Sequence, residues 1–158
     1  AACLAEMEFV DLMVGKVADL CRRFGCTLAV IADHGQVRLQ PERAVEIGPE
    51  LRASLQRPPG GARRAPYLTG VDVARLQAEP GLADAVQLAI ATDDAIDAGW
   101  FGGPCEGLTS RLGDTIVLAA EGVQFLYDYG RGTFAQSGSH SGMTSREMHV
   151  PLIVVPGN

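Results

Sequence analysis

Residues 27–36 read TLAVIADHGQ, and this stretch indicates the class of fold. The apolar run at 27–31 predicts a short buried strand, and Asp33 and His34 follow where that strand should end. Upstream, residues 4–24 place apolar side chains three or four positions apart, which predicts an amphipathic helix with Gly25 as its C-terminal cap. Helix, tight turn, strand and polar loop form an α/β unit, and such sheets hold ligands at the carboxyl ends of their strands.

Asp33 and His34 are the first candidates for chemistry. A carboxylate and an imidazole are common ligands of divalent ions, and neighbouring residues at a strand end can both turn toward one cation. Gly35 fits this interpretation, because a residue without a side chain lets the backbone turn sharply beside a metal. The alternative is an aspartate that caps a turn beside a surface histidine.

His140 is the second candidate, in the polar segment SGSHSGMTSREM (137–148). The small residues around it leave room for a cofactor or a substrate, although an exposed loop histidine fits the same pattern. Thr144 and Glu147 have the spacing of a capping box, which predicts a short helix from Ser145. We interpret His149 as structural, and the run VPLIVV (150–155) as a final buried strand.

The middle of the chain carries weaker signals. Arg63 and Arg64 are candidates for a substrate contact, because a guanidinium can bind a phosphate through two N–H groups, although a solvated arginine is the alternative. The other expected elements are a strand at 64–70, helical pieces at 71–80 and 82–98, and a hairpin of 111–120 with 123–129.

The composition excludes some functions. Thirteen Lys and Arg against nineteen Asp and Glu give a net charge of −6, a poor balance for nonspecific nucleic-acid binding. The apolar runs are too short to cross a membrane, so we expect no membrane partner. No basic-then-apolar leader opens the sequence, which favours a cytoplasmic location, although a first residue other than Met leaves open whether the chain begins where its gene begins.

Three stretches together resemble the type I phosphodiesterase/nucleotide pyrophosphatase family of the alkaline phosphatase superfamily. They are a strand leading into ADHG (32–35), the corner GWFGGP (99–104) followed by RLGD (111–114), and HSGMTSREMHVPLIVV (140–155). The resemblance spans roughly residues 1–155, but the specific motifs are the two histidine segments. Compared with the usual forms TADHG and HGG(x)xxEMxVPL, Ile31 replaces a threonine, Ser141 a glycine and His149 an apolar residue.

The resemblance implies two zinc ions about 4 Å apart, a spacing suited to in-line phosphoryl transfer. It implies that Asp33 and His34 hold one ion and His140 the other. The family's nucleophile, usually a threonine, and its remaining metal ligands precede the helix at 4–24. We therefore expect no catalytic nucleophile in this chain, and interpret it as the C-terminal portion of the enzyme, which alone neither binds zinc tightly nor turns over.

The fold expected from this resemblance is an incomplete α/β sandwich with a mostly parallel central sheet and a small α+β cap. Residues 1–61 and 133–158 would form the metal-site core, and 62–132 the inserted cap. The expected function is hydrolysis of a phosphodiester, phosphomonoester or pyrophosphate bond in a small substrate such as a nucleotide. A noncatalytic α/β binding or regulatory module is the alternative, and a sulfatase-like or mutase-like branch is a third.

Overall fold

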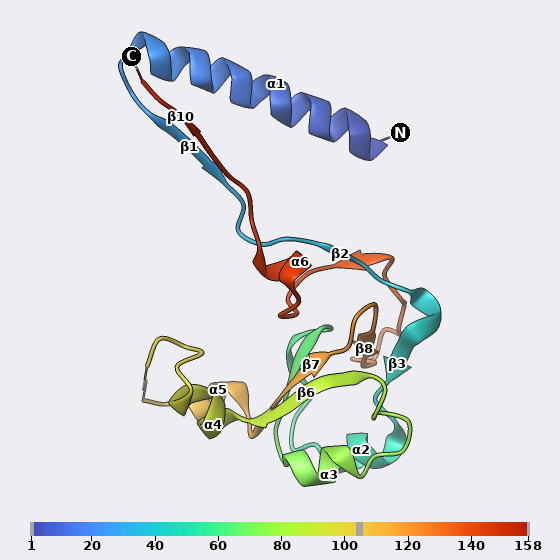
Figure 1. Cartoon of the computed structure of the whole chain (residues 1–158). Coiled ribbons are helices and arrows are strands. Elements are labelled where there is room, and N and C mark those ends of the chain that lie inside the picture. Colours follow the sequence, from blue (N-terminus) through green and yellow to red (C-terminus); the bar gives the residue numbers. More distant parts are fainter. Residues whose placement is uncertain (1, 104–105, 158) are drawn as a thin grey trace. The chain divides into compact units, whose positions relative to one another are not determined.

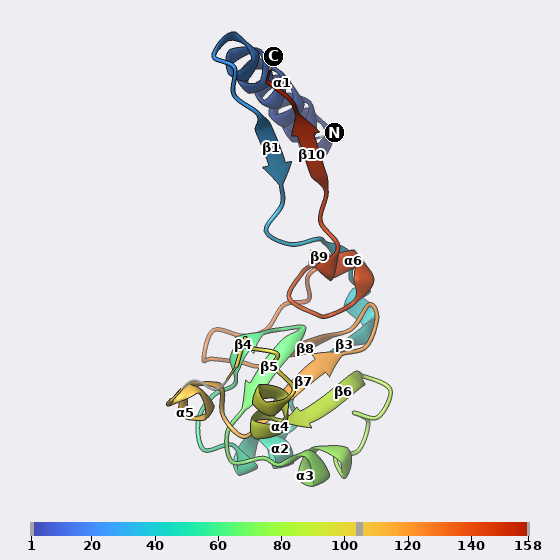
Figure 2. The same ribbon diagram turned by 60° about the vertical axis from the view of Figure 1, so that its left-hand side comes forward.

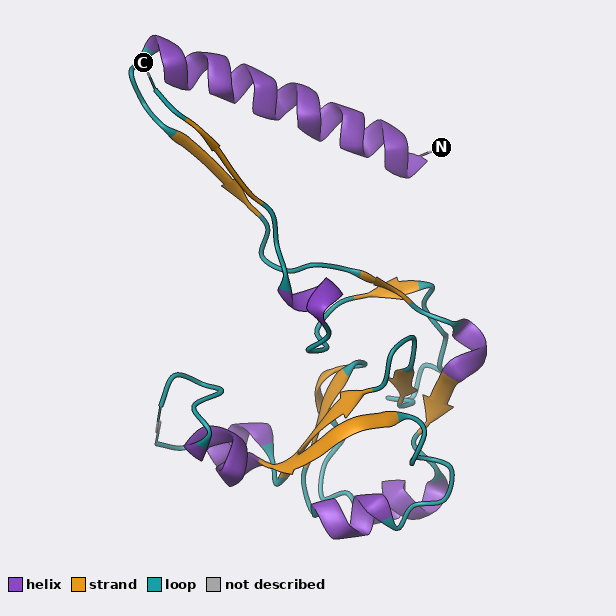
Figure 3. Ribbon diagram, viewed as in Figure 1, coloured by secondary structure: helices purple, strands orange, loops and turns teal. Residues whose placement is uncertain are grey.

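The computed structural model describes residues 2–103 and 106–157, so Pro104, the last residue of the predicted aromatic corner, lies outside the described residues. The backbone divides into two compact units, residues 1–33 with 150–158 and residues 34–149. Figure 1 labels most of the helices and strands of the two units, and Figure 3 distinguishes helix from strand by colour. Within the described residues, no helix is both long and apolar enough to cross a membrane.

The first unit contains α1 (Ala2–Arg23), β1 (Leu28–Ile31) and β10 (Leu152–Val155), the predicted helix and two strands. The prediction that both strands are buried is wrong, because most of their residues are half-buried or exposed. α1 ends at a turn in which Gly25 has φ +63°, the left-handed conformation typical of a C-terminal cap. β1 and β10 pair antiparallel, with Leu28 opposite Val155 and Ile31 opposite Leu152. The two motif-bearing ends of the chain are therefore joined by one ladder of hydrogen bonds.

Much apolar surface of the first unit is exposed. Only Ala18 is buried in α1, whereas Leu4 and Met7 keep 64% of their surface accessible. The strands are similar, since Ile31 and Leu152 are 66% and 68% exposed. Apolar patches of this kind ordinarily mark a surface that another element covers.

The second unit is built on a four-stranded antiparallel sheet in the order β4 (Gly60–Ala62), β5 (Ala65–Leu68), β7 (Thr115–Ala119), β6 (Val86–Ala91). Figure 2 shows these four strands side by side. All five residues of β7 are buried. Alternate side chains of a strand point to opposite faces, and accordingly Val117 and Ala119 belong to one apolar cluster while Ile116 and Leu118 belong to another.

Short helices supply the partners of these two clusters. α2 (Pro49–Ser54) and α3 (Val73–Gln77) bury Leu51 and Leu76 against the Val117 side of the sheet. α4 (Thr92–Asp97) buries Ala95 against Ile116, and α5 (Leu108–Leu112) adds the half-buried Leu112. The sheet is thus covered on both faces.

The remaining elements of the second unit pair segments far apart in the sequence. β2 (Val37–Arg38) runs antiparallel to β9 (Gly138–Ser139), and β3 (Ala44–Glu46) runs parallel to β8 (Gln124–Leu126). A 3₁₀ turn, η1 (Pro41–Arg43), links β2 to β3, and α6 is the predicted short helix, Ser145–Met148.

Three expectations require correction. The predicted hairpin of 111–120 with 123–129 is wrong, because β5 and β6 occupy both edges of β7 and β8 pairs with β3 instead. The predicted helix at 82–98 is wrong over 86–91, where β6 pairs with β7. The α/β class is confirmed, but the expected mostly parallel sheet is not seen: β3–β8 is the one parallel pair among the described strands, and the largest described sheet is antiparallel. The cap predicted at 62–132 lies within the second unit and stays a prediction.

A buried ion pair joins three segments of the second unit. Arg64, between β4 and β5, is fully buried, and its Nε and Nη2 donate to the two carboxylate oxygens of Glu147 in α6 at 2.5 and 2.8 Å. Its Nη1 donates to the carbonyls of Ala120 and Val123 at 3.0 and 2.7 Å. All three guanidinium nitrogens are therefore used inside the protein.

Glu147 is equally well satisfied. Its carboxylate also accepts from the Gly142 N–H at 2.9 Å and from the Thr144 hydroxyl at 2.7 Å, and the predicted capping box is confirmed. Burial acts to raise the pKa of Glu147, but the hydrogen bonds from Arg64, Thr144 and Gly142 outweigh it and lower the pKa from 4.5 to about 2.

We expect Glu147→Gln to lower the free energy of unfolding by about 3–5 kcal/mol, because it leaves the Arg64 charge buried without a counterion. Urea unfolding at neutral pH measures this loss. Glu121→Gln, at an exposed position in the turn after β7, is the matched control and should change stability by less than about 0.5 kcal/mol.

The ion pair also sets an acid dependence. Because the folded pKa of Glu147 lies below its ordinary value, the carboxylate's contribution is complete above pH 4.5 and is lost as the pH falls toward 2. Unfolding free energies measured across this window should fall more steeply for the unmodified chain than for Glu147→Gln. Parallel curves would show that another group controls the acid response.

Candidate metal centre

The structure brings His34 and His140 into direct contact. Their rings stack with centroids 3.6 Å apart and an angle of 6° between the ring planes. The antiparallel pairing of β2 with β9 explains this contact. Val37 lies opposite Ser139. Because His34 precedes Val37 and His140 follows Ser139, both histidines lie beyond the same end of the strand pair. Two residues separated by 106 positions in the sequence thus meet in one unit, as the motifs predict.

Hydrogen bonds at Nδ1 orient both imidazoles. His34 Nδ1 lies 2.8 Å from the Gly35 carbonyl oxygen, which can only accept, so this nitrogen carries the proton and the lone pair of the neutral ring is on Nε2. His140 Nδ1 lies 3.2 Å from the Ser141 hydroxyl. Metal-binding histidines are commonly oriented by such a bond at the other ring nitrogen.

Gly35 fixes the backbone beside His34 against α6. Its N–H donates to the Glu147 carbonyl at 2.8 Å, and a Cβ at this position would lie 1.9 Å from the Arg146 carbonyl oxygen. A side chain cannot be accommodated at that distance. The glycine of ADHG is therefore required by close packing on the helix that carries Glu147.

Asp33 is the last residue of the first unit, and it is exposed just beyond the end of β1. Its predicted role as a metal ligand stays a prediction. Within residues 2–103 and 106–157, no group of three or more His, Cys, Asp or Glu side chains is arranged to hold a metal. The two histidines are consequently a partial donor set, of the chemistry that zinc prefers but short of its four ligands.

The predicted arginines lie in different surroundings. Arg64 is fully buried on Glu147 and cannot reach a substrate, which leaves Arg63 as the candidate for a substrate contact. Arg63 is half-buried, donates to the Phe134 carbonyl at 2.5 Å and stacks 4.3 Å above the centre of the Phe134 ring. His149, interpreted as structural, is the C-terminal cap of α6.

A cavity of about 480 Å³ lies beside His140. Its wall includes Arg63, together with Tyr127, Tyr129 and Arg131 from the segment that follows β8. Sequence analysis missed these last three residues, although the Asp-Tyr-Gly-Arg-Gly spacing at 128–132 is a recognisable turn signal.

The turn at 128–132 is held by one carboxylate. Asp128 Oδ1 accepts from the N–H groups of Gly130, Arg131 and Gly132 at 2.7, 2.9 and 2.8 Å. The Gly130 and Gly132 bonds lower the pKa of Asp128, because they stabilise its ionised form. The pKa of Tyr129 is raised, first by partial burial and then by Tyr127, and its hydroxyl donates to the Pro59 carbonyl at 2.8 Å.

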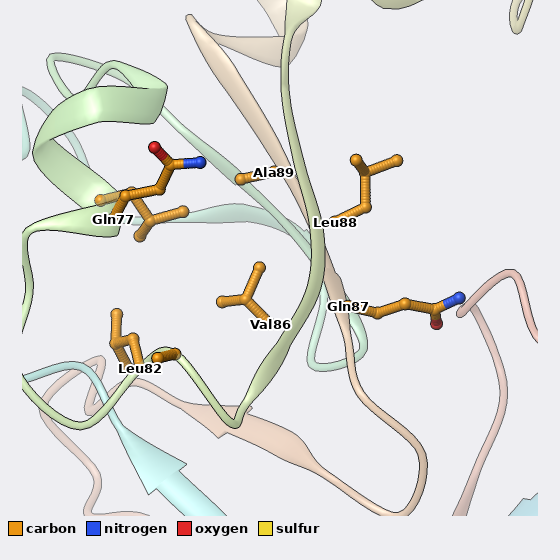
Figure 4. A pocket seen from close by; sticks show the side chains of 8 residues that line it. Gln77, Leu82, Val86, Gln87, Leu88 and Ala89 are labelled. Atoms are coloured by element: carbon orange, nitrogen blue, oxygen red, sulfur yellow. The ribbon is translucent and has the colours of Figure 1, made fainter.

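A second cavity, of about 390 Å³, lies between α3 and β6 (Figure 4). Leu82, Val86 and Ala89 line it together with the amide of Gln77, and none of its lining residues is titratable. It lacks the groups that acid–base, metal or phosphoryl chemistry requires.

Comparison with known proteins supports the fold. No protein-family model matches the sequence, and no curated protein sequence is significantly similar to it. Solved structures do match, and the chain shares their fold over the part that it covers.

One such structure is murine ectonucleotide pyrophosphatase/phosphodiesterase 5, with a TM-score of 0.65 and 15% identity over 94% of this chain. An inactive variant of that protein, in complex with AMP, matches equally well. Phosphonoacetate hydrolase from Sinorhizobium meliloti 1021, in complex with phosphonoformate, has a TM-score of 0.56 and 21% identity over 85% of this chain. The chain spans 39% and 37% of the lengths of these two proteins.

Ser141 gives the site a strained backbone position. It is the one non-glycine residue with positive φ among those described, at +86°, and the resembling family usually has glycine there. We expect the unfolding free energy of the Ser141→Gly variant to be about 1 kcal/mol higher than that of the Ser141→Ala variant. Both variants lose the hydroxyl, but only glycine relieves the backbone strain. Urea unfolding of the two variants measures the difference, and equal stabilities would exclude strain at this position.

Proposed function

We propose that this chain supplies part of the two-metal centre of a hydrolase that cleaves phosphodiester, phosphomonoester or pyrophosphate bonds. The observation that carries the proposal is the parallel contact of His34 with His140. Two-metal sites hold their ions about 3.5–4 Å apart, so ligands of both ions must lie close together, as these two stacked rings do. The likeness in fold to a pyrophosphatase/phosphodiesterase and to a phosphonoacetate hydrolase supports the hydrolase class.

In this proposal His34 and Asp33 hold one zinc ion and His140 holds the other. The donor types fit, since imidazole and carboxylate are standard zinc ligands. When bound, the ions would polarise the phosphoryl oxygens and stabilise the charge of an in-line displacement. The chain's own residues orient the imidazoles through Gly35 and Ser141, and hold both loops against α6.

Arg63 is the proposed substrate contact within this chain. It lines the same cavity as His140, and a guanidinium matches the geometry of phosphate and carboxylate groups. The AMP complex of the pyrophosphatase/phosphodiesterase neighbour supports a nucleotide as one substrate.

The nucleophile and the remaining ligands are proposed to lie in the part of the domain that this chain does not contain. Two observations support this: the chain spans about two-fifths of the matched structures, and the apolar surfaces of α1 and β1 are exposed. By itself the chain would then bind zinc weakly and turn over no substrate.

A noncatalytic module that retains the fold is the second candidate. The absence of a cluster of three or more metal-binding side chains among the described residues favours it. The zinc content of the protein extended to the full domain separates the two candidate functions. An enzyme should hold zinc near stoichiometrically, and a noncatalytic module should hold none.

We expect His34→Ala and His140→Ala each to weaken zinc binding by this chain at least tenfold, because each removes one of few ligands. Calorimetric titration with zinc measures the change, and His149→Ala is the control that should leave the affinity unchanged. Zinc binding that survives both ligand variants would place the metal elsewhere. Steady hydrolysis of a nitrophenyl phosphodiester by the unmodified chain would contradict its proposed incompleteness.

A form extended by the preceding coding sequence tests the whole proposal. That segment should supply an aspartate, a threonine and a D-x-x-x-H pair, and should make the protein a zinc-dependent hydrolase. In that form we expect Arg63→Ala to lower kcat/KM about tenfold, as expected when one charged hydrogen bond is lost, with little change in unfolding free energy. An unchanged kcat/KM would remove the arginine from the substrate site.

A further inference from the structure

The turn that ends α1 is a complete Schellman motif. Gly25 follows the end of the helix in the left-handed conformation, with φ +63°. Its N–H donates to the Arg22 carbonyl at 3.3 Å, and the Cys26 N–H donates to the Cys21 carbonyl at 2.9 Å. These two bonds define the motif and satisfy carbonyls that a helix end otherwise leaves unpaired. The backbone of the turn is therefore closed on itself.

Two cysteines occupy the positions of this motif whose side chains meet. In a Schellman turn the residue after the glycine commonly contacts a residue of the last helical turn, and here these residues are Cys26 and Cys21. The hydrogen bond between them, together with standard bond lengths, limits the separation of their Cα atoms to less than about 7 Å. Disulfides join Cα atoms about 4.4–6.8 Å apart. The two backbones are therefore close enough for a disulfide.

The two thiols differ in accessibility, as a two-step oxidation requires. Cys26 is exposed, and its Sγ donates to the Phe24 carbonyl at 3.6 Å, so the thiol lies folded back over the turn. Cys21 is half-buried, on the side of α1 that carries the buried Ala18 one turn earlier. An exposed thiol can meet an oxidant from solution, and a half-buried neighbour can then displace that oxidant.

The turn is also packed against the end of the chain, which follows β10 to its side (Figure 1). A Cβ at Gly157 would lie 2.7 Å from the Gly25 carbonyl carbon, and the Gly157 N–H donates to the Thr27 hydroxyl at 3.4 Å. A backbone held in this way limits the conformations that the two thiols can explore. Their effective concentration toward each other is correspondingly high.

We propose that Cys21 and Cys26 form a redox-active dithiol site that closes to a disulfide with an oxidised low-molecular-weight thiol such as glutathione disulfide. The Cys26 thiolate attacks one sulfur of glutathione disulfide, which forms a mixed disulfide and releases one glutathione thiolate. The Cys21 thiolate then attacks the Cys26 sulfur and releases the second glutathione. In total the two protein thiols lose two protons and two electrons, and one disulfide is reduced to two thiols.

The new bond would fasten the end of α1 to the residues just before β1, the strand that leads into Asp33. All of the residues involved belong to the first unit, and none of them is part of the proposed metal centre. The dithiol site therefore does not depend on the proposed function.

Peptide mapping of the full 158-residue chain tests the proposal. The chain is equilibrated in EDTA with mixtures of reduced and oxidised glutathione, quenched with acid, alkylated and cleaved with trypsin. Cleavage after Lys and Arg places each cysteine on its own peptide: 1–16 for Cys3, 17–22 for Cys21, 24–38 for Cys26 and 76–111 for Cys105. We expect the second and third of these peptides to be joined, with a mass lower by two hydrogen atoms than that of the separate peptides.

The same equilibrium in concentrated urea distinguishes the folded turn from mere proximity in the sequence. A flexible chain can also join these two cysteines, but it loses the entropy of closing the loop. We therefore expect the equilibrium constant for oxidation by glutathione disulfide to be at least about tenfold larger in the folded chain than in the unfolded chain.

Cys26→Ser should abolish the linked peptides. Cys3→Ser, at an exposed cysteine near the other end of α1, should leave the link and its equilibrium constant unchanged. Circular dichroism checks that each variant is folded. Glutathione attached to single cysteines without a bond between Cys21 and Cys26, or equal equilibrium constants with and without urea, would overturn the site.

Discussion

The ion pair between Arg64 and Glu147 is the interaction on which the rest of the second unit depends. It joins the β4–β5 turn, the turn after β7 and helix α6 through donors and acceptors that are all satisfied. α6 in turn packs against Gly35, and Gly35 adjoins His34. A buried charge pair that is not itself a proposed metal ligand thereby supports the backbone beside one of the two histidines.

Helices and caps could be predicted from the sequence where a few neighbouring residues determine them. The apolar spacing of α1, the Gly25 cap and the Thr144–Glu147 capping box each depend on a few neighbouring residues, and each is present. The strand at 86–91 was not accessible, because its conformation is imposed by pairing with β7. The false hairpin has the same origin, since nothing near residue 121 reveals that both edges of β7 are already occupied.

Some residues of the candidate site could likewise be found from the sequence, and others could not. His34 and His140 stand out in sequence because polar residues follow or interrupt apolar runs, and β2–β9 pairing brings them together. Arg64 was misjudged because a buried arginine and a ligand-binding arginine look alike until a partner carboxylate is known. Tyr129 and Arg131 were missed because their importance comes from the cavity they line, which no spacing encodes.

The exposed side chains of α1 have a consequence for handling the protein. Leu4, Met7 and Phe9 present to water a surface of the kind that chaperones and detergents bind. The light scattered by solutions of this chain should therefore rise more steeply than in proportion to protein concentration. A mild detergent should suppress this excess scattering. The colloidal behaviour of the molecule is thus set by its first helix, while its chemistry belongs to residues more than a hundred positions apart.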